Sequence, residues 1–511
     1  MKLSGPLLKK VDRNSDLYKK LATAHPKIAQ KDPTLWGTKA SHEAAIRLNW
    51  VDLPTSSLTL LPDVSLLCEM FKGCSRVVLC GMGGSSLGPE VIAQSNHREL
   101  FIFDSTDPHY AVHAIGDDLK STLVIVSSKS GSTIETSSQR SLFEGKFRES
   151  GLNPTEHMLF VTDPGSPLDI EVRAAGFSVI NADPHVGGRF SVLSAFGLVP
   201  SALVGVDIEQ LLRDAQREKE YFLANPTDIL DIAYLLVAEA KQYISFTDDH
   251  SKVPGLSDWI EQLIAESTGK DSVGRLPIAT ENVQVAKIGG ALTVAFAGTG
   301  ADLVVEGDLG AHFIFWEWVT ALLGVGLKID PFNQPNVTEA KEQTAACLAE
   351  WENQLPMLTP QCTDSGVEIF GDGQSLKDAL ATFIEDVKDG GYIAIMAYLD
   401  RRDDLKIAEL RSILSEKSGK PTSFGWGPRF LHSTGQFHKG GQKNGSFLQI
   451  TGDTRVDFEI PGRPFTLKTL LFAQAIGDNR ALATRKYPLL RLHLQTRSAG
   501  IDQLLAAARS L

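Results

Sequence analysis

The feature that most constrains the fold is a series of short apolar runs that begins at residue 76. Five runs rich in β-branched or aromatic residues follow one another at a spacing of roughly 20 to 35 residues, which is the spacing that βαβ units give. These runs are Arg76–Cys80, Leu100–Phe103, Thr122–Val126, Met158–Val161 and Phe177–Ile180. Helix-type segments lie between them, so the sequence predicts a doubly wound parallel sheet.

A second set of apolar runs follows a mostly helical segment. The strand-type runs are Val283–Ile288, Leu292–Phe296, Leu303–Val305, Val367–Phe370, Tyr392–Tyr398 and Phe447–Thr451, and the helix-type stretches are Ile208–Phe222, Ile229–Ile244, Val337–Trp351 and Leu405–Ser415. We therefore expect an α/β protein with two doubly wound α/β/α sandwich domains with parallel sheets. The expected division is an N-terminal helical lead-in over residues 1–45, a first domain over 46–205, a second domain with inserted helices over 206–460 and a helical C-terminal segment over 461–511.

Length and charge narrow the class of protein. A chain of 511 residues has room for two large domains. With 50 Lys and Arg against 62 Asp and Glu, the net charge is −12, which disfavours nucleic acid as a partner.

The most apolar stretch, His312 to Leu327, contains Glu317 and falls short of the ~20 residues of a membrane span. The start has no signal-peptide core, and the five cysteines form no CxxC pair, so we expect a soluble cytoplasmic protein without disulfides or zinc.

The first predicted strand runs into a glycine-rich turn, Gly81-Met-Gly-Gly-Ser-Ser-Leu-Gly-Pro89. Such a turn lets the backbone approach a phosphate and directs N–H groups at it. A dinucleotide fingerprint is one interpretation, because Asp104 ends the next strand. However, Ser86 stands where the third glycine of that motif belongs. A tight turn without a ligand is the other alternative.

The third predicted strand ends in Ser127-Ser-Lys-Ser-Gly-Ser-Thr-Ile-Glu-Thr136, where a helix should begin. One or two of these hydroxyls could cap the helix, but the first seven residues carry five. Hydroxyls and backbone N–H groups at a helix N-terminus form a phosphate cradle, and Lys129 adds a positive charge. Because the carboxyl ends of parallel strands meet at one edge of a sheet, the two turns predict a phosphate-bearing ligand there.

These residues carry a resemblance to a known family. The Ser128–Thr136 loop resembles the phosphosugar-binding loop of sugar isomerase (SIS) domains, and together with Gly81–Pro89 it is similar to the glucose-6-phosphate isomerase (phosphoglucose isomerase) family. Three further blocks match in order: Val186–Ser191, Gln262–Lys270 and Gly435–Gly441. The chain looks closest to the branch related to transaldolase–isomerase fusions. The resemblance implies reversible isomerisation of glucose 6-phosphate to fructose 6-phosphate, in glycolysis and gluconeogenesis, by tandem SIS domains.

The resemblance also implies roles for individual residues. Glu266 would move a proton between C1 and C2 through a cis-enediol, and Arg189 would stabilise the negative charge of the enediolate. His312 and Lys439 would open the sugar ring. The substrate and its phosphate would be held by Gly84, Ser85, Ser128, Lys129, Ser130, Ser132, Thr133 and Gln262. The family uses no metal or cofactor, and it forms a homodimer in which the active-site histidine comes from the neighbouring subunit.

Structural interpretations of the same residues remain open. Glu266 could be a surface residue near a helix end at Gly269, Arg189 could pair with Asp183, and His312 could be a core or interface histidine. A non-catalytic tandem-SIS protein that senses phosphosugars is the alternative function, and a nicotinamide-dependent oxidoreductase is a third.

Two further patterns have weaker claims to a site. His109 and His113 stand four residues apart, but no carboxylate stands at the position of an H-E-x-x-H motif, so a solvated helix face is preferred. Gly269-Lys270 lacks the first glycine and the Ser or Thr of a P-loop, so hydrolysis of ATP is not supported.

Overall fold

A parallel five-stranded sheet forms the first α/β unit of the computed structural model, which describes residues 1–239, 241–351 and 355–511. Its strand order is β3-β2-β4-β5-β6, and each neighbouring pair is parallel. The strands are β2 (Arg76–Gly81), β3 (Phe101–Phe103), β4 (Thr122–Ser127), β5 (Met158–Thr162) and β6 (Ser178–Asn181). All five runs predicted between residues 76 and 180 are therefore strands, and the prediction of a doubly wound parallel sheet is confirmed.

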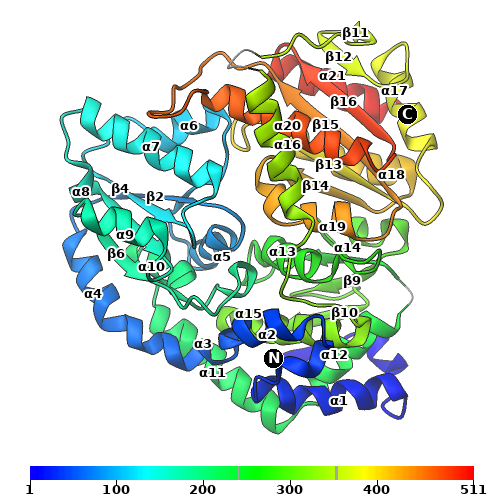
Figure 1. The fold of residues 1–511 in the computed structure, drawn as a ribbon. Helices are drawn as coiled ribbons and strands as arrows, with labels where there is room; N and C mark the ends of the chain where they lie inside the picture. Colours follow the sequence, from blue (N-terminus) through cyan, green and yellow to red (C-terminus); the bar gives the residue numbers. More distant parts are fainter. Residues whose placement is uncertain (240, 352–354) are drawn as a thin grey trace.

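Alternate residues of β2 explain why both faces of this sheet are covered. Val77 and Leu79 join the core on one face, whereas Val78 and Cys80 join the core on the other. Helices α4 (Leu61–Met70), α5 (Leu87–Ser95) and α10 (Ala195–Leu203) pack on the first face, and α6 (Pro108–Ile115), α7 (Ile134–Glu149) and α9 (Pro167–Ala174) on the second. The short α8 (Pro154–His157) leads into β5. This unit lies at the left of Figure 1.

A second five-stranded sheet has the order β1-β10-β9-β7-β8, in which only β1 is antiparallel to its neighbour. Its strands are β1 (Lys2–Ser4), β7 (Tyr243–Thr247), β8 (Leu276–Ala279), β9 (Leu292–Ala295) and β10 (Leu303–Glu306). The helices of this part are α1 (Asp16–Ala29), α2 (Ser41–Arg47), α3 (Leu53–Ser56), α11 (Ile208–Ala224), α12 (Thr227–Ala238), α13 (Leu256–Thr268), α14 (Val283–Ala286) and α15 (Leu309–Leu327). Figure 1 shows α1 on the far side of α15 from the sheet.

A six-stranded sheet completes the fold, with the order β11-β12-β16-β15-β13-β14. Strands β13 (Tyr392–Tyr398), β14 (Thr422–Trp426), β15 (Gly445–Gly452) and β16 (Leu489–Leu494) are parallel, whereas β11 (Cys362–Asp364) and β12 (Val367–Phe370) form an antiparallel edge. The accompanying helices are α16 (Val337–Glu350), α17 (Leu376–Glu385), α18 (Glu409–Ser418), α19 (Gly435–Gly440), α20 (Leu467–Ala483) and α21 (Arg497–Arg509). The region expected to form one second sandwich is thus divided over two sheets.

Several local predictions need correction. Residues Val283–Ala286 are helical rather than extended, because Asn282 accepts a hydrogen bond from the N–H of Val285 and caps a turn. The helix expected over Ile229–Ile244 ends at Ala238, and Tyr243 begins β7. The C-terminal segment contains the predicted helices α20 and α21, but β16 lies between them as an inner strand of the third sheet.

The apolar helix α15 lies inside the protein. It is the one helix of the described residues with the length and hydropathy to span a membrane, yet 89% of that apolar window is buried. It packs against α11 and α12, and its Trp316 and Trp318 are fully buried in the main core. The helix is therefore the core helix of its unit.

Candidate active site

The two predicted phosphate turns meet at the carboxyl edge of the first sheet. Gly81, at the end of β2, pairs with Ser127, at the end of β4. A cavity of about 270 Å³ opens beside them between the first sheet and the elements of the other two. It is lined by Met82, Gly83, Gly84, Ser85, Ser127, Ser128, Lys129, Ser130, Thr133, Thr136, Gly188, Arg189, Gln262, Glu266, Gln334, Val337, Lys341 and His432.

The N-terminus of α7 forms one wall of this cavity. Thr133 is the residue before the helix, and its side chain makes no capping hydrogen bond. The hydroxyls of Ser127 and Thr136 are buried and have no hydrogen-bond partner among the described residues. Unpaired hydroxyls beside the positive end of a helix dipole favour an anionic ligand. This wall can therefore hold the phosphate of a substrate.

The other hydroxyls of the loop shape its backbone. The Ser128 hydroxyl accepts a hydrogen bond from the N–H of Gly131 at 3.1 Å, and the hydroxyls of Ser130 and Ser132 lie 2.7 Å apart. Ser128 and Ser130 line the cavity, but Ser132 lines two neighbouring hollows instead. The structure therefore does not bring Ser132 into the predicted site, because its side chain turns back onto the loop.

Lys129 brings a cation to the rim of the cradle. Its ammonium group lies 2.8 Å from a carboxylate oxygen of Asp163 and 5.7 Å from the centre of the Phe196 ring. Burial lowers the pKa of Lys129, and Asp163 opposes that effect. The carboxylate fixes the lysine in place, so a bound phosphate would share this cation with Asp163.

Two glycines of the first turn allow the site to assemble. Gly83 has a φ of +56°, and a Cβ there would lie 2.8 Å from Nε2 of Gln262 and 2.9 Å from the carbonyl oxygen of His432. A Cβ on Gly84 would lie 1.9 Å from the carbonyl oxygen of Gly188, beside Arg189. Contacts this short exclude any side chain. The absence of side chains at these two glycines thus lets the first turn pack against Gln262, His432 and Gly188.

Glu266 and Arg189 form another wall of the cavity. Helix α13 carries Gln262 and Glu266 one turn apart, so both side chains lie on the same face. Nη1 of Arg189 lies 3.0 Å from Oε1 of Glu266, and Nε2 of Gln262 donates to Oε2 of Glu266 at 3.1 Å. The side chain of Glu266 is 13% exposed, toward the cavity it lines. It is therefore not a solvated surface residue.

The guanidinium of Arg189 is held on several sides. It donates to the Ser267 hydroxyl at 2.8 Å, to Oε1 of Gln334 at 3.1 Å and to two backbone carbonyls between residues 331 and 333. Its ion-pair partner is Glu266, whereas Asp183 binds Asn49. Burial lowers the pKa of Arg189 and Glu266 opposes this, but a guanidinium remains protonated in proteins. Arg189 therefore supplies a fixed positive charge beside the carboxylate.

The histidine of the cavity is His432, which the sequence interpretation did not choose. It ends the short 3₁₀ helix η9 (Arg429–His432) after β14, and its Nε2 lies 2.9 Å from Oε1 of Glu135 in α7. Burial would raise the pKa of Glu135, but the neighbouring His432 ring holds it below its ordinary value. Gln474 donates to the same oxygen at 2.7 Å. The carboxylate thus orients the imidazole at the cavity wall.

His312 does not reach the cavity. It lies in the first turn of α15, is fully buried, and packs against Phe296 with ring centres 5.3 Å apart. Burial lowers the pKa of His312 to about 3, so the ring is neutral at pH 7. The apolar helix thus places His312 inside the core of its own chain, as the structural interpretation has it, and the role of His312 in ring opening stays a prediction.

Lys439 also lies away from the cavity walls. Its ammonium group lies 2.6 Å from Oδ1 of Asp478 in α20, and the two side chains are only 2% and 1% exposed. A buried ammonium needs such a partner to offset its lost hydration. Lys439 thus joins α19 to α20, and its role in ring opening stays a prediction. Lys341 of α16 is the lysine that lines the cavity beside Lys129.

The site residues that the sequence did not predict are Glu135, His432 and three residues between positions 334 and 341. Glu135 stands in the Ser128–Thr136 loop, where its position at the start of a helix could have drawn attention. His432 stands only three residues before the Gly435–Gly441 block. Gln334, Val337 and Lys341 carry no local pattern, because only the tertiary fold brings α16 over the first sheet.

Similarity to known proteins agrees with this geometry. The phosphoglucose isomerase family model matches residues 65–302, which include the two phosphate turns, Arg189 and Glu266. Residues 65–302 are therefore similar to the phosphoglucose isomerase family. The chain is 33% identical over 245 residues to a glucose-6-phosphate isomerase of Campylobacter jejuni, a match that covers 45% of this chain and 60% of that protein. It is 33% identical over 211 residues to one of a Cyanothece species, covering 38% of this chain and 40% of that protein.

The phosphoglucose isomerase match extends to the fold but not along the whole chain. A crystal structure of a glucose-6-phosphate isomerase from Chlamydia trachomatis superposes with a TM-score of 0.50 at 20% identity, over 61% of this chain and 76% of that one. The chain spans about 40% to 60% of the length of the curated relatives it matches. His432 and Lys439 lie outside residues 65–302, so the structure alone places them.

Proposed function

We propose that this protein is a glucose-6-phosphate isomerase, which interconverts glucose 6-phosphate and fructose 6-phosphate. One observation carries the proposal: Glu266, paired with Arg189, faces a phosphate cradle across a single cavity. The relatives named glucose-6-phosphate isomerase support the choice of substrate. The reaction belongs to glycolysis and gluconeogenesis.

The geometry supports proton transfer through a cis-enediol. With the phosphate on the α7 wall, C1 and C2 of the open-chain sugar lie toward Glu266. One carboxylate on one face can take the proton from one carbon and return it to the other. Arg189 stabilises the negative charge that develops on the enediolate oxygen, as donors of an oxyanion hole do. Neither step uses a cofactor.

Ring opening falls to His432. A histidine can donate a proton to the ring oxygen and accept one from the C1 hydroxyl. The bond to Glu135 fixes the orientation of the imidazole. Because His432 comes from the same chain, this proposal does not take a histidine from a neighbouring subunit. We retain a cytoplasmic homodimer as part of the proposal, on the family resemblance.

A coupled assay tests the proposed function. Purified protein is mixed with glucose 6-phosphate, and formation of fructose 6-phosphate is followed without added nicotinamide cofactor in the isomerisation step. Turnover on the scale of seconds is the expected result, since enzymes turn over at about 1–10³ s⁻¹. Phosphosugar binding without turnover would favour the alternative, a tandem-SIS sensor, and would contradict the proposal.

A further inference from the structure

A histidine and two aspartates meet at the junction of the first and third sheets, outside the active site. They are His113, in the last turn of α6, and Asp400 and Asp403, in the turn that follows β13. Nε2 of His113 lies 3.0 Å from Oδ2 of Asp403 and 3.5 Å from Oδ2 of Asp400. The three ligand-type atoms all lie within 4.8 Å of one another.

One carboxylate oxygen in this group has no partner of its own. Asp400 is fully buried, and its Oδ1 accepts hydrogen bonds from the N–H groups of Arg402 and Asp403, at 2.8 and 3.3 Å. Its Oδ2 is buried without a hydrogen-bond partner among the described residues and faces His113. A buried unpaired carboxylate oxygen calls for a cation.

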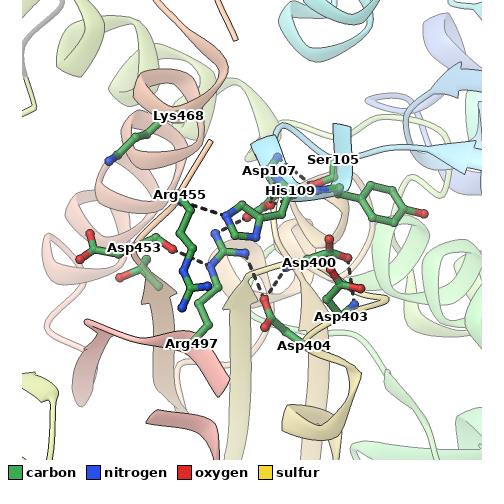
Figure 2. Close-up of polar contacts among 12 residues, drawn as sticks. Ser105, Asp107, His109, Asp400, Asp403, Asp404, Asp453, Arg455, Lys468 and Arg497 are labelled. Atoms are coloured by element: carbon green, nitrogen blue, oxygen red, sulfur yellow. Dashed lines mark hydrogen bonds and ion pairs between the residues drawn. The ribbon is translucent and has the colours of Figure 1, made fainter. Parts of the chain in front are cut away.

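The neighbouring arginines do not neutralise the negative charge of Asp400 and Asp403. Figure 2 shows Arg497 between Asp107 and Asp404, and its guanidinium lies 2.6 Å from Oδ2 of Asp107 and 3.0 Å from Oδ2 of Asp404. The guanidinium of Arg402 lies over the Phe101 ring instead, at 5.2 Å from its centre. Asp400 and Asp403 are therefore left with the imidazole of His113 as the group that faces both.

The two protein segments are held rigidly in place. Oδ1 of Asp107 caps α6 by accepting from the N–H groups of His109 and Tyr110. Oδ2 of Asp404 accepts from the N–H of Asp400 at 3.1 Å and fixes the turn after β13. His109, the other histidine of α6, points elsewhere, since its Nε2 accepts from the N–H of Arg455 (Figure 2). Preorganised ligands of this kind favour a bound ion.

We propose that His113, Asp400 and Asp403 bind a divalent transition-metal ion of the zinc class, with water in the remaining position. A tetrahedral ion with bonds of about 2.0–2.2 Å keeps its ligand atoms about 3.3–3.6 Å apart, close to the 3.0 and 3.5 Å between Nε2 of His113 and the two carboxylate oxygens. One imidazole and two carboxylates suit zinc or cobalt better than magnesium, which prefers oxygen ligands alone. Asp403 is 60% exposed, so the ion has a route from solvent.

The ion would join two parts of the molecule. Helix α6 belongs to the first sheet, and the turn after β13 belongs to the third, while the active-site cavity lies between these units. None of the three ligands lines that cavity, so the ion takes no part in the proposed proton transfer. Its effect is to hold the first unit against the third.

Titration of metal-stripped protein with Zn²⁺ tests the site. The expected result is one equivalent bound by calorimetry, with a raised melting temperature. Binding should weaken at least tenfold in His113→Ala and in Asp403→Asn, which removes the carboxylate that pairs with His113. His250→Ala, which removes a histidine that is 92% exposed, is the matched control and should bind as the unmodified protein does.

Two further readouts identify the ligands. Co²⁺ bound to the site should show a visible absorption band without a thiolate charge-transfer band, which excludes the five free cysteines. Mg²⁺ should not compete at equal concentration. Binding that survives both His113→Ala and Asp403→Asn, a thiolate band, or no binding at all would overturn the proposal.

Discussion

Nη1 of Arg189 lies 3.0 Å from Oε1 of Glu266, and both side chains line the same cavity as the phosphate cradle. Arg189 comes from the short 3₁₀ helix η6 (Gly188–Phe190) of the first unit, and Glu266 comes from α13 of the second. The proposed reaction therefore depends on how two units pack. The following predictions test separate parts of that arrangement.

Replacing the guanidinium of Arg189 should slow the chemical step. Arg189→Lys keeps one charge but loses the fork of donors, so we expect kcat to fall by about 10²–10³, as for loss of an oxyanion-hole donor. Steady-state kinetics with glucose 6-phosphate give the measurement. Arg173→Ala, which removes an exposed arginine that pairs with Asp169, should leave kcat unchanged. An unaltered kcat in Arg189→Lys would remove Arg189 from the mechanism.

Two histidine variants test whether His432 or His312 is the acid–base group of ring opening. His432→Asn should lower kcat by about 10²–10⁴, because it removes general acid–base catalysis of ring opening. His312→Gln should retain turnover, because His312 is buried in α15 away from the cavity. Melting temperatures of both variants control for folding. The opposite pattern would show that His312, not His432, serves the site.

Two glycines, one from each segment, give a matched test of the close approach between the phosphate turn and the Arg189 segment. Gly84→Ala places a Cβ 1.9 Å from the carbonyl oxygen of Gly188, so we expect a loss of ~1–3 kcal/mol in the free energy of unfolding and loss of activity. Gly187→Ala meets no atom within 4 Å and should be tolerated. Chemical denaturation gives the free energy of unfolding of both variants, and equal values for the two would contradict the packing described.

A buried acid in α15 should make stability depend on pH. Glu317 is fully buried, its carboxylate oxygens have no partner among the described residues, and burial raises its pKa well above the ordinary value. The folded pKa of Glu317 lies above the unfolded value of about 4.3. Below that pH the carboxyl is neutral in both states. As the pH rises, the unfolded protein releases the proton first, so the free energy of unfolding falls. Glu317→Gln does not titrate and should be more stable than the unmodified protein at pH 8.

The measurement for Glu317 is the free energy of unfolding of both proteins between pH 4 and 8. The difference in favour of Glu317→Gln should grow as the pH rises above about 4.3. Glu69, whose side chain is 70% exposed, provides the control, and Glu69→Gln should show no such trend. A difference that is constant across this range would mean that Glu317 is ionised in the folded protein.

The first sheet and most of its site could be predicted from local pattern alone. The inner strands β2, β4 and β5 are almost wholly buried on both faces, so their apolar runs are continuous and easily recognised in the sequence. The loops after β2 and β4 carry hydroxyls and glycines in numbers that capping does not require. Family resemblance then pointed to Arg189 and Glu266, which the structure brings together with those loops.

The rest of the site could not be predicted because it depends on long-range packing. His432 lies beside Glu135 only because the third sheet packs against α7, and no periodicity in the chain reports that contact. Lys439 and His312 matched short motifs but lie buried, where a carboxylate and an apolar helix hold them. In the third sheet, the sequence predicts a helical segment where Leu489–Leu494 forms β16, because one short inner strand between two helices leaves little signal.

The central claim is that Glu266 moves the proton between C1 and C2, and proton exchange with solvent tests it most directly. Glucose 6-phosphate is incubated with enzyme in D₂O, and deuterium at C2 is followed by NMR, for the unmodified protein and for Glu266→Gln. We predict that the unmodified protein incorporates deuterium, and that Glu266→Gln loses incorporation by at least 10³-fold while still binding the sugar phosphate. Incorporation at an unchanged rate in Glu266→Gln would contradict the assignment of Glu266 as the base.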